Sequence, residues 1–300
     1  MREWIERRAN SLFVISCVIG LIWPYWDWTS DIFVQIILMI ATFIACFKLS
    51  LSEFKQLSWK PLCLFIILRY TLFAWLLYAV SSMIFPPDIA LGILLMAALP
   101  SAAAAPAMTN IFGGQVTLTA IVTIATTIMV PFTIPLLFSF TGGSTIMPSP
   151  ADLLQTLAII LLLPCALFIL LRHIKPLQTS VQHYGKASTI ILISIMLATV
   201  IGQQREFVLS DPSLLSAMFA LSLVIYLLML LSGWFAGRTF ARDQRIALTI
   251  SFGFNNAALG IAIAALHFSP TVVVVTVAAE LSWALLPYIT KRLIKNAELS

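Results

Sequence analysis

The sequence predicts an all-α integral membrane protein with about ten transmembrane helices, and three observations support this. Of the 300 residues, 61% are hydrophobic and only 10% are charged, whereas about a quarter of the residues in soluble proteins are charged. Apolar runs of membrane-spanning length follow one another along the whole chain. The basic residues gather in alternate loops between these runs.

Ten apolar runs have the length needed to cross a hydrocarbon core. We expect helices at residues 11–28, 31–47, 61–84, 88–112, 115–140, 152–172, 187–203, 213–236, 244–267 and 270–290. The loops between them are short and marked by Pro, Gly or Asp, as at Pro86-Pro87-Asp88. None is long enough for a folded domain, so residues 1–300 are expected to form one transmembrane unit.

The lysines and arginines orient these helices, because cytoplasmic loops carry them in excess. With a cytoplasmic N-terminus, fifteen of the 17 fall in inside loops, while Arg205 falls outside and Arg69 lies within a helix. Three Trp and one Tyr at residues 23–28 mark the outer end of the first helix. We expect a multi-pass protein of the plasma (inner) membrane with both termini cytoplasmic. The net charge of +5 is then a topology signal and does not indicate a nucleic-acid partner.

Ten helices divide into two sets of five, and an odd number in each half gives the halves opposite orientations. We therefore expect inverted repeats at approximately residues 1–140 and 151–300, a common transporter design. The fourth and ninth helices begin with weakly similar sequences, since each follows an acidic residue, Asp88 or Asp243, and opens with Ile-Ala-Leu.

These two helices are also interrupted near their middles. The fourth carries Pro-Ser-Ala-Ala-Ala-Ala-Pro at residues 100–106, and the ninth carries Gly-Phe-Asn-Asn at residues 253–256. Proline removes backbone donors, and small side chains let other backbones approach. Paired interruptions in corresponding helices point to a binding site at the membrane midplane, so we expect both helices to break and cross there. The alternative is a simple proline kink, with a pair of amides that only join helices.

Two segments resemble the bile acid:sodium symporter family. One runs from Asp88 to Thr127 and includes Gly114-Gln115-Val116, and the other runs from Thr249 to Phe268 and includes Gly-Phe-Asn-Asn. The resemblance implies a panel domain of helices 1, 2, 6 and 7 and a core domain of helices 3–5 and 8–10. Broken helices 4 and 9 would cross within the core. It also implies secondary transport of a small organic anion, with the lipid bilayer and that anion as the partners.

The same resemblance suggests site residues. Sodium-coupled members carry a Ser-Asn pair, a Glu and a Gln where this sequence has Ala105-Pro106, Ser251 and Arg69. Suitable side-chain oxygens remain on helices 5 and 9. The candidate residues for substrate or ion binding are Arg69, Pro106, Thr119, Thr123, Ser251, Asn255, Asn256 and Glu280. Sodium needs several oxygens and is repelled by a guanidinium, so sodium coupling is disfavoured and proton coupling stays open.

Arg69 and Glu280 are charges inside predicted helices. Arg69 lies nine residues beyond Lys60, or roughly 13 Å into the membrane, and Glu280 lies ten residues before Thr290. Isolated charges at such depth cost about 2.5–3.5 kcal/mol each and commonly mark a pathway, a relay or an ion pair. An ion pair between the two is geometrically possible. It would be either a static bridge or a titratable pair in which Arg69 supplies the charge that sodium supplies elsewhere.

Other classes of protein predict different features. A drug/metabolite-type ten-helix exporter would share the composition but lack the crossing motifs, and a non-transporting membrane protein is the remaining alternative. No P-loop, HExxH or GxSxG motif lies in a span, so we expect no enzyme and no catalytic residues. His173 and His183 are placed in a cytoplasmic loop. The four cysteines lack metal-ligand spacing, so no metal or other cofactor is expected. The substrate identity, coupling ion and oligomeric state are left open.

Overall fold

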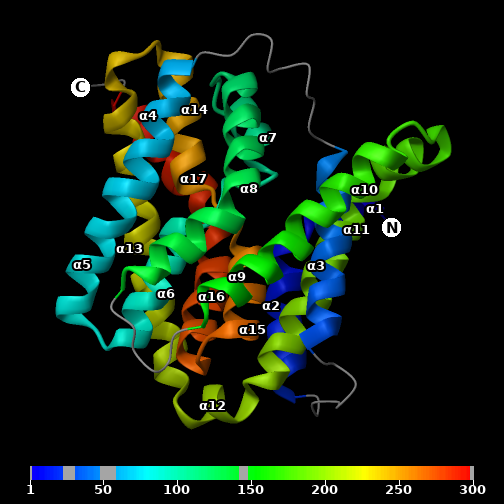
Figure 1. Ribbon diagram of the computed structural model, residues 1–300, viewed down its shortest axis with the longest axis vertical. Helices are drawn as coiled ribbons and strands as arrows, with labels where there is room; N and C mark the ends of the chain where they lie inside the picture. The colour runs from blue at the N-terminus through cyan, green and yellow to red at the C-terminus, as the bar shows by residue number, and fades with distance from the viewer. Residues whose placement is uncertain (1, 23–30, 48–58, 142–147, 298–300) are drawn as a thin grey trace.

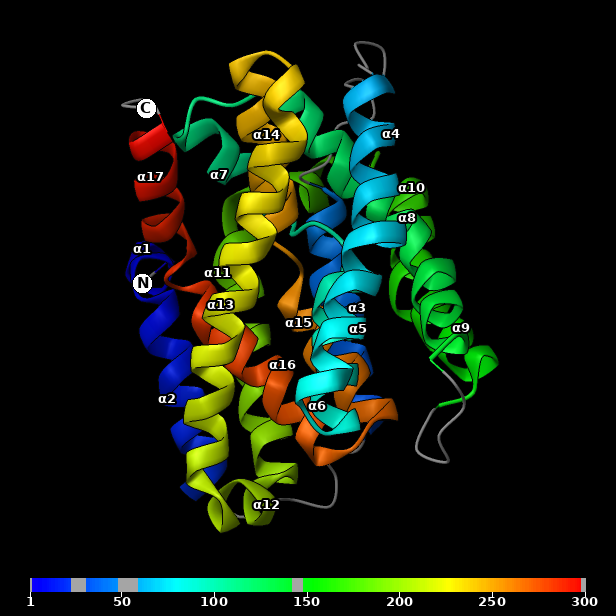
Figure 2. The ribbon, with the colours of Figure 1, turned by 90° about the vertical axis from the view of Figure 1, so that its left-hand side faces the viewer.

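The computed structural model describes residues 2–22, 31–47, 59–141 and 148–297, and these residues are helical almost throughout (Figure 1). The all-α prediction is confirmed. Most helices run along the long axis of the molecule (Figure 2). The aromatic cluster at residues 23–28 and most of the predicted seam between the repeats, residues 142–147, lie outside the described residues.

One group of helices packs together as a first bundle, with α3, α10 and α11 on the right of Figure 1. Its members are α2 (Ala9–Ile22), α3 (Asp31–Cys46), α11 (Lys175–Gln203) and one continuous helix made of α9 (Pro150–Leu157), the π-helical turn η3 (Ala158–Leu162) and α10 (Leu163–Leu171). Helix α11 packs on both α2 and α3. Gly20 permits the close approach of α2, because a Cβ there would lie 2.5 Å from the carbonyl oxygen of Ala198.

The other helices form a second bundle, with α4, α5 and α13 on the left of Figure 1. Its members are α4 (Trp59–Ile67), the π-helical turn η2 (Leu68–Phe73), α5 (Ala74–Ile84), α6 (Pro87–Ala98), α7 (Ala105–Ile111), α8 (Val116–Ser139), α13 (Pro212–Ala236), the 3-10 turn η4 (Gly237–Thr239), α14 (Arg242–Gly253), α15 (Ala257–His267), α16 (Pro270–Trp283) and α17 (Leu286–Ala297). The short helix α12 (Arg205–Ser210) connects the two bundles.

Helices α6 and α15 form the centre of the second bundle. Every residue of α6 from Ile89 to Ala98 is buried, as is every residue of α15 from Ala257 to Ala264. A helix that is apolar on all sides is expected in such a position. Helix α15 also reaches the first bundle, where it packs on α3 and α11. His267 at its end shares a 2.9 Å hydrogen bond with Thr156 of α9.

The observed helices refine the predicted membrane spans. Among the described residues, five helices are long and apolar enough to cross a membrane, and α16 with α17 form a sixth if their 57° bend lies within one span. The predicted spans 88–112 and 244–267 each consist of two helices. The first predicted span runs into residues that the structure does not describe. The count of ten therefore stays a prediction.

The loop predicted before residue 187 was wrong. Helix α11 begins at Lys175, so His183 lies on this helix. The error arose because the prediction followed apolar runs, and the first turns of α11 are polar.

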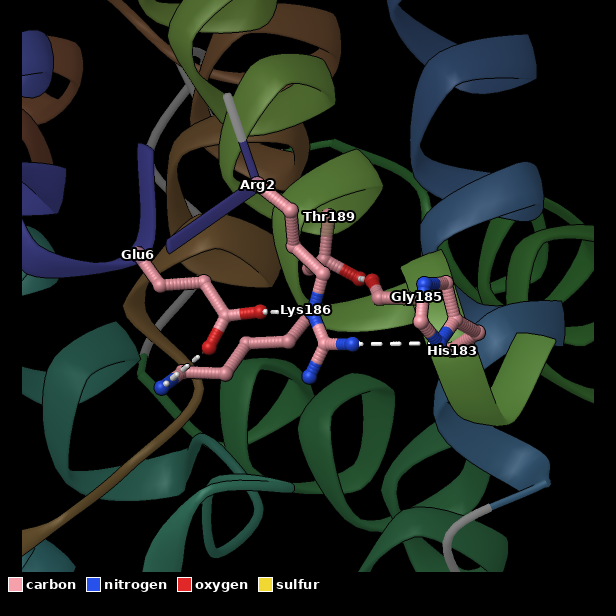
Figure 3. A network of polar contacts seen from close by, with 6 residues as sticks. All are labelled: Arg2, Glu6, His183, Gly185, Lys186 and Thr189. Atoms are coloured by element: carbon pink, nitrogen blue, oxygen red, sulfur yellow. Dashed lines mark hydrogen bonds and ion pairs between the residues drawn. The ribbon is translucent and has the colours of Figure 1, made fainter. Parts of the chain in front are cut away.

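This polar part of α11 binds the short N-terminal helix α1 (Arg2–Arg7). Glu6 accepts hydrogen bonds from Arg2 Nε at 2.9 Å and Lys186 Nζ at 3.1 Å, and Arg2 also contacts His183 Nδ1 at 3.2 Å (Figure 3).

Candidate functional site

Two broken helices meet inside the second bundle. Helix α6 ends at Ala98 and α7 begins at Ala105, while α14 ends at Gly253 and α15 begins at Ala257. The first break follows from proline chemistry, because Leu99 precedes Pro100 and takes an extended conformation (φ −62°, ψ 147°).

The two interrupted segments pair with each other through their backbones. The N–H of Ala102 donates to the carbonyl of Phe254 at 2.7 Å, and the N–H of Asn256 donates to the carbonyl of Pro100 at 2.9 Å. Ser101 and Asn255 form an isolated antiparallel bridge. The predicted break and crossing of these helices at residues 100–106 and 253–256 are confirmed.

Asn255 fastens the crossing to its surroundings. Its Nδ2 donates to the carbonyl of Met96 at 2.8 Å, and its Oδ1 accepts from the hydroxyl of Tyr226 at 2.9 Å. Asn255 and Tyr226 are both buried. This single amide therefore connects α6, α13 and the segment between α14 and α15.

Helix α8 supplies hydroxyl groups to the same place. Thr123 Oγ1 lies 3.3 Å from Ser101 Oγ, and Thr126 Oγ1 accepts from the N–H of Ser101 at 3.2 Å. Thr119 lies one turn away and shares a 2.8 Å hydrogen bond with Thr109 of α7. The structure therefore brings Thr123 to the crossing and gives Thr119 a contact with the neighbouring half-helix.

Asn256 and Pro106 are partly exposed. Asn256 caps α15, since its Oδ1 accepts from the N–H of Leu259 at 3.2 Å. Its amide nitrogen has no hydrogen-bond partner in the part of the chain that the structure describes. Pro106 lies in the first turn of α7, where its missing N–H costs nothing. Asn256 is therefore a side chain at the crossing that can still bind another molecule.

Arg69 approaches the crossing from the π-helical turn η2 and is fully buried. Its Nη1 donates to the carbonyls of Ser251 at 3.3 Å and Phe252 at 2.5 Å, and its Nη2 donates to the carbonyl of Leu99 at 2.9 Å. These carbonyls belong to the C-terminal ends of α14 and α6. π-Helical turns are frequent at functional sites, and this one aims a guanidinium at two helix ends.

Ser251 and Glu280 complete the set of predicted site residues. Ser251 is buried beside Arg69, and its hydroxyl has no hydrogen-bond partner among the described residues. Glu280 is half-buried on α16. The hydrogen bonds of Arg69 all go to backbone carbonyls, and in the described structure it forms no ion pair with Glu280. The pair that the sequence permits is not present.

The electrostatics of the crossing follow from the helix ends that meet there. The C-terminal ends of α6 and α14 carry partial negative charge, and the N-terminal end of α15 carries partial positive charge. The charge of Arg69 offsets the two C-terminal ends, at about −0.5 each, and the N-terminal end of α15 then gives the crossing a net partial positive charge.

Three polar residues at the crossing were not predicted as site residues. Ser101 lies within the interrupted segment, and Thr126 lies on the same helix face as Thr123, three residues further on, so both could have been found from spacing. Tyr226 is one hydroxyl in a long apolar helix, and only the hydrogen bond to Asn255 reveals it.

Taken with the apolar helices, a polar crossing of two broken helices defines a secondary transporter, because irregular backbone at membrane depth is tolerated beside protein or a watery pathway. The chain belongs to the sodium bile acid symporter family, whose model matches residues 35–211, more than half of its length. The family is one of transporters, so this chain is a multi-pass membrane transporter of a small molecule and not an enzyme.

Two relatives agree with this assignment. The uncharacterized sodium-dependent transporter YocS of Bacillus subtilis (strain 168) is 26% identical over 265 residues, which cover 86% of this chain and 81% of the relative. The probable sodium/metabolite cotransporter BASS1, chloroplastic, of Arabidopsis thaliana is 25% identical over 280 residues, which cover 89% of this chain and 69% of the relative.

Proposed function

We propose that this protein carries a small organic anion across the membrane and binds it at the crossing of α6–α7 with α14–α15. The observation that supports this most is the buried guanidinium of Arg69, which no carboxylate of the described residues neutralises. A net positive site at membrane depth favours an anion. The relative named a metabolite cotransporter supports a metabolite as the substrate class.

The proposed binding roles divide between direct and supporting residues. Asn256 donates to the anion through its amide nitrogen, and Pro106 in the first turn of α7 is a further proposed contact. Arg69 and Ser251 supply charge and a hydroxyl behind the crossing. Asn255, Thr119 and Thr123 hold the half-helices in place. Glu280 is the candidate carboxylate for proton coupling.

The proposed mechanism moves the two bundles against each other. The first bundle corresponds to a panel domain and the second to a core domain. Their described contacts include the α15 contacts with α3 and α11 and the hydrogen bond between His267 and Thr156. Breaking and re-forming such contacts would expose the crossing alternately to the two sides of the membrane.

The proposed topology has ten spans in two inverted repeats, approximately residues 1–140 and 151–300. In this arrangement α6 with α7 forms one span, and α14 with α15 forms its counterpart in the other repeat. Both termini are cytoplasmic, in a plasma (inner) membrane. Cysteine labelling of Arg8→Cys and Lys295→Cys from each side of sealed vesicles tests the orientation. Labelling of either position from the outside would contradict it.

Uptake by proteoliposomes tests the transport proposal. A set of radiolabelled mono- and dicarboxylates is offered to the purified protein under imposed sodium and proton gradients, with empty liposomes as the baseline. We expect saturable uptake of at least one carboxylate, and weaker uptake with a raised KM in Asn256→Asp, which places a negative charge at the site. Glu206→Gln, an exposed change on α12, is the matched control. Uptake of none of these anions by the folded protein would contradict the proposal and favour a non-transporting role.

The drug/metabolite-type exporter is not favoured. That alternative predicts no crossing of the fourth and ninth helices, whereas the two broken segments form a backbone bridge between Ser101 and Asn255. The family assignment points the same way.

A further inference from the structure

Three backbone carbonyls converge on one point beside the crossing. They belong to Leu99, just past the end of α6, and to Ser251 and Phe252, in the last turn of α14. All three residues are buried. In transporters with broken helices, the C-terminal ends of half-helices are where coupling cations are bound, because partial negative charges gather there.

In this protein the guanidinium of Arg69 occupies that point. Its two terminal nitrogens divide between the helix ends, Nη2 with Leu99 at 2.9 Å and Nη1 with Phe252 at 2.5 Å and Ser251 at 3.3 Å. One planar group therefore joins α6 to α14 through directed hydrogen bonds. A single ammonium or metal ion at this point would join them by charge alone.

Two aromatic rings lie beside the guanidinium. Its Cζ lies 5.7 Å from the ring centroid of Phe65 and 5.8 Å from that of Phe252, and these rings contact each other edge to face. Carbonyl oxygens and the faces of aromatic rings attract a cation in an apolar interior. Arg69 has an exposed fraction of 0% and cannot lose its proton at any physiological pH, so its charge is permanent.

We propose that Arg69 is a built-in cation that takes the place of a coupled sodium ion at the crossing, so that the anion site is complete without sodium. This inference rests on the proposed function and concerns the coupling of transport to a cation. The substrate anion is attracted by a charge that belongs to the protein. A sodium ion about 4 Å from this guanidinium would bind about a thousandfold more weakly than at the same carbonyls without Arg69. The relatives whose names include sodium are thus expected to differ from this chain at the crossing.

A direct measurement on the wild-type protein tests this first. Radiolabelled sodium binding is measured on the purified protein by scintillation proximity, and the melting temperature is compared in sodium, potassium and choline chloride at equal ionic strength. We expect no saturable sodium binding and equal melting temperatures in the three salts. Saturable sodium binding, or a rise in melting temperature that only sodium produces, overturns the proposal.

The variant Arg69→Gln tests the replacement itself. Removing the charge leaves the carbonyls of Leu99, Ser251 and Phe252 and the Ser251 hydroxyl without a cation, and glutamine is too short to reach all of them. We expect this variant to gain a melting-temperature response to sodium that potassium and choline do not produce. A folded Arg69→Gln protein without any sodium response overturns the idea that Arg69 stands in for the ion.

Arg245→Gln is the matched control. Arg245 also donates to a backbone carbonyl, that of Trp234 at 2.9 Å, and stacks on an aromatic ring at 3.7 Å, but it lies near the start of α14, away from the crossing. We expect no sodium response from this control. These measurements use sodium alone as the probe, so they stay decisive even if the uptake assay were to overturn the transport proposal. If Arg69→Gln does not fold, the wild-type measurement still decides.

Discussion

Two polar networks in this protein place positive charge in opposite ways. At the junction of α1 with α11, Arg2 and Lys186 both pair with a carboxylate, that of Glu6 (Figure 3). At the crossing, Arg69 pairs only with backbone carbonyls and is fully buried. A counter-charge supports the first network, whereas helix ends support the second.

The difference shows what each network can do. Exposed ion pairs contribute about 0–1 kcal/mol each and are screened by salt. A buried guanidinium that lacks a carboxylate partner keeps its net charge, so it can act on a ligand. The surface network therefore fastens one helix, and the crossing network can set which ligand the protein accepts.

The largest effect should come from Asn255→Ala. This change leaves the carbonyl of Met96 and the hydroxyl of Tyr226 buried without a partner, and each such group costs about 1–3 kcal/mol. We expect a large fall in melting temperature together with loss of uptake. A melting temperature within error of the wild type would show that Asn255 does not fasten the crossing.

Asn256 should separate stability from binding. Asn256→Ala removes the cap of α15 and should cost about 1 kcal/mol. Asn256→Asp keeps a capping oxygen, so stability should be retained, but its negative charge should repel the anion and raise the KM for uptake. Thermal unfolding and uptake kinetics of both variants check this. Normal KM values in both would limit Asn256 to its capping role.

Glu280→Gln should change the pH response more than the stability. Because Glu280 has no ion pair in the described structure, the change should alter unfolding by less than about 1 kcal/mol. Glu280 lies within electrostatic reach of two titratable side chains on other helices, Tyr226 on α13 and Cys17 on α2. We expect the wild type, but not the variant, to respond to an imposed pH gradient, with Glu206→Gln as the control. An unchanged pH response would leave Glu280 with a packing role.

The surface network should show the smallest effect. Hydrogen bonds from Arg2 and Lys186 lower the pKa of Glu6 below its ordinary value of 4.5. A lowered pKa means that the contact stabilises the folded state above about pH 4.5 and that this contribution is lost as the pH falls through the lowered pKa. Glu6→Gln should therefore lower the stability of the contact between α1 and α11 at neutral pH by less than about 1 kcal/mol. We expect faster limited trypsin cleavage after Arg8 and unchanged uptake. Lys175→Gln on α11 is the control, and equal cleavage in wild type and Glu6→Gln would show that the network does not hold α1.

The sequence predicted the breaks in both helices, because proline and the Gly-Phe-Asn-Asn segment act locally on the backbone. It also placed Arg69 inside the membrane from hydropathy alone. It could not show that Arg69 would choose carbonyls over Glu280, since every residue has a carbonyl and only the fold decides which ones are free. The polar start of α11 was missed because the prediction followed apolar runs, and the bend between α16 and α17 was missed although Pro287 marks the start of α17.

The π-helical turn η2 makes the length of its helix matter as much as its composition. Such a turn holds one residue more than an α-helical turn. Deleting one residue between Leu68 and Phe73 would restore a regular α-helical turn and redirect the side chains within it, while α4 and α5 on either side would stay nearly in phase. Arg69 would then leave the carbonyls, whereas α5 would keep its packing on α6. A one-residue gap in this short stretch is thus a mark by which relatives that lack this internal charge can be sought.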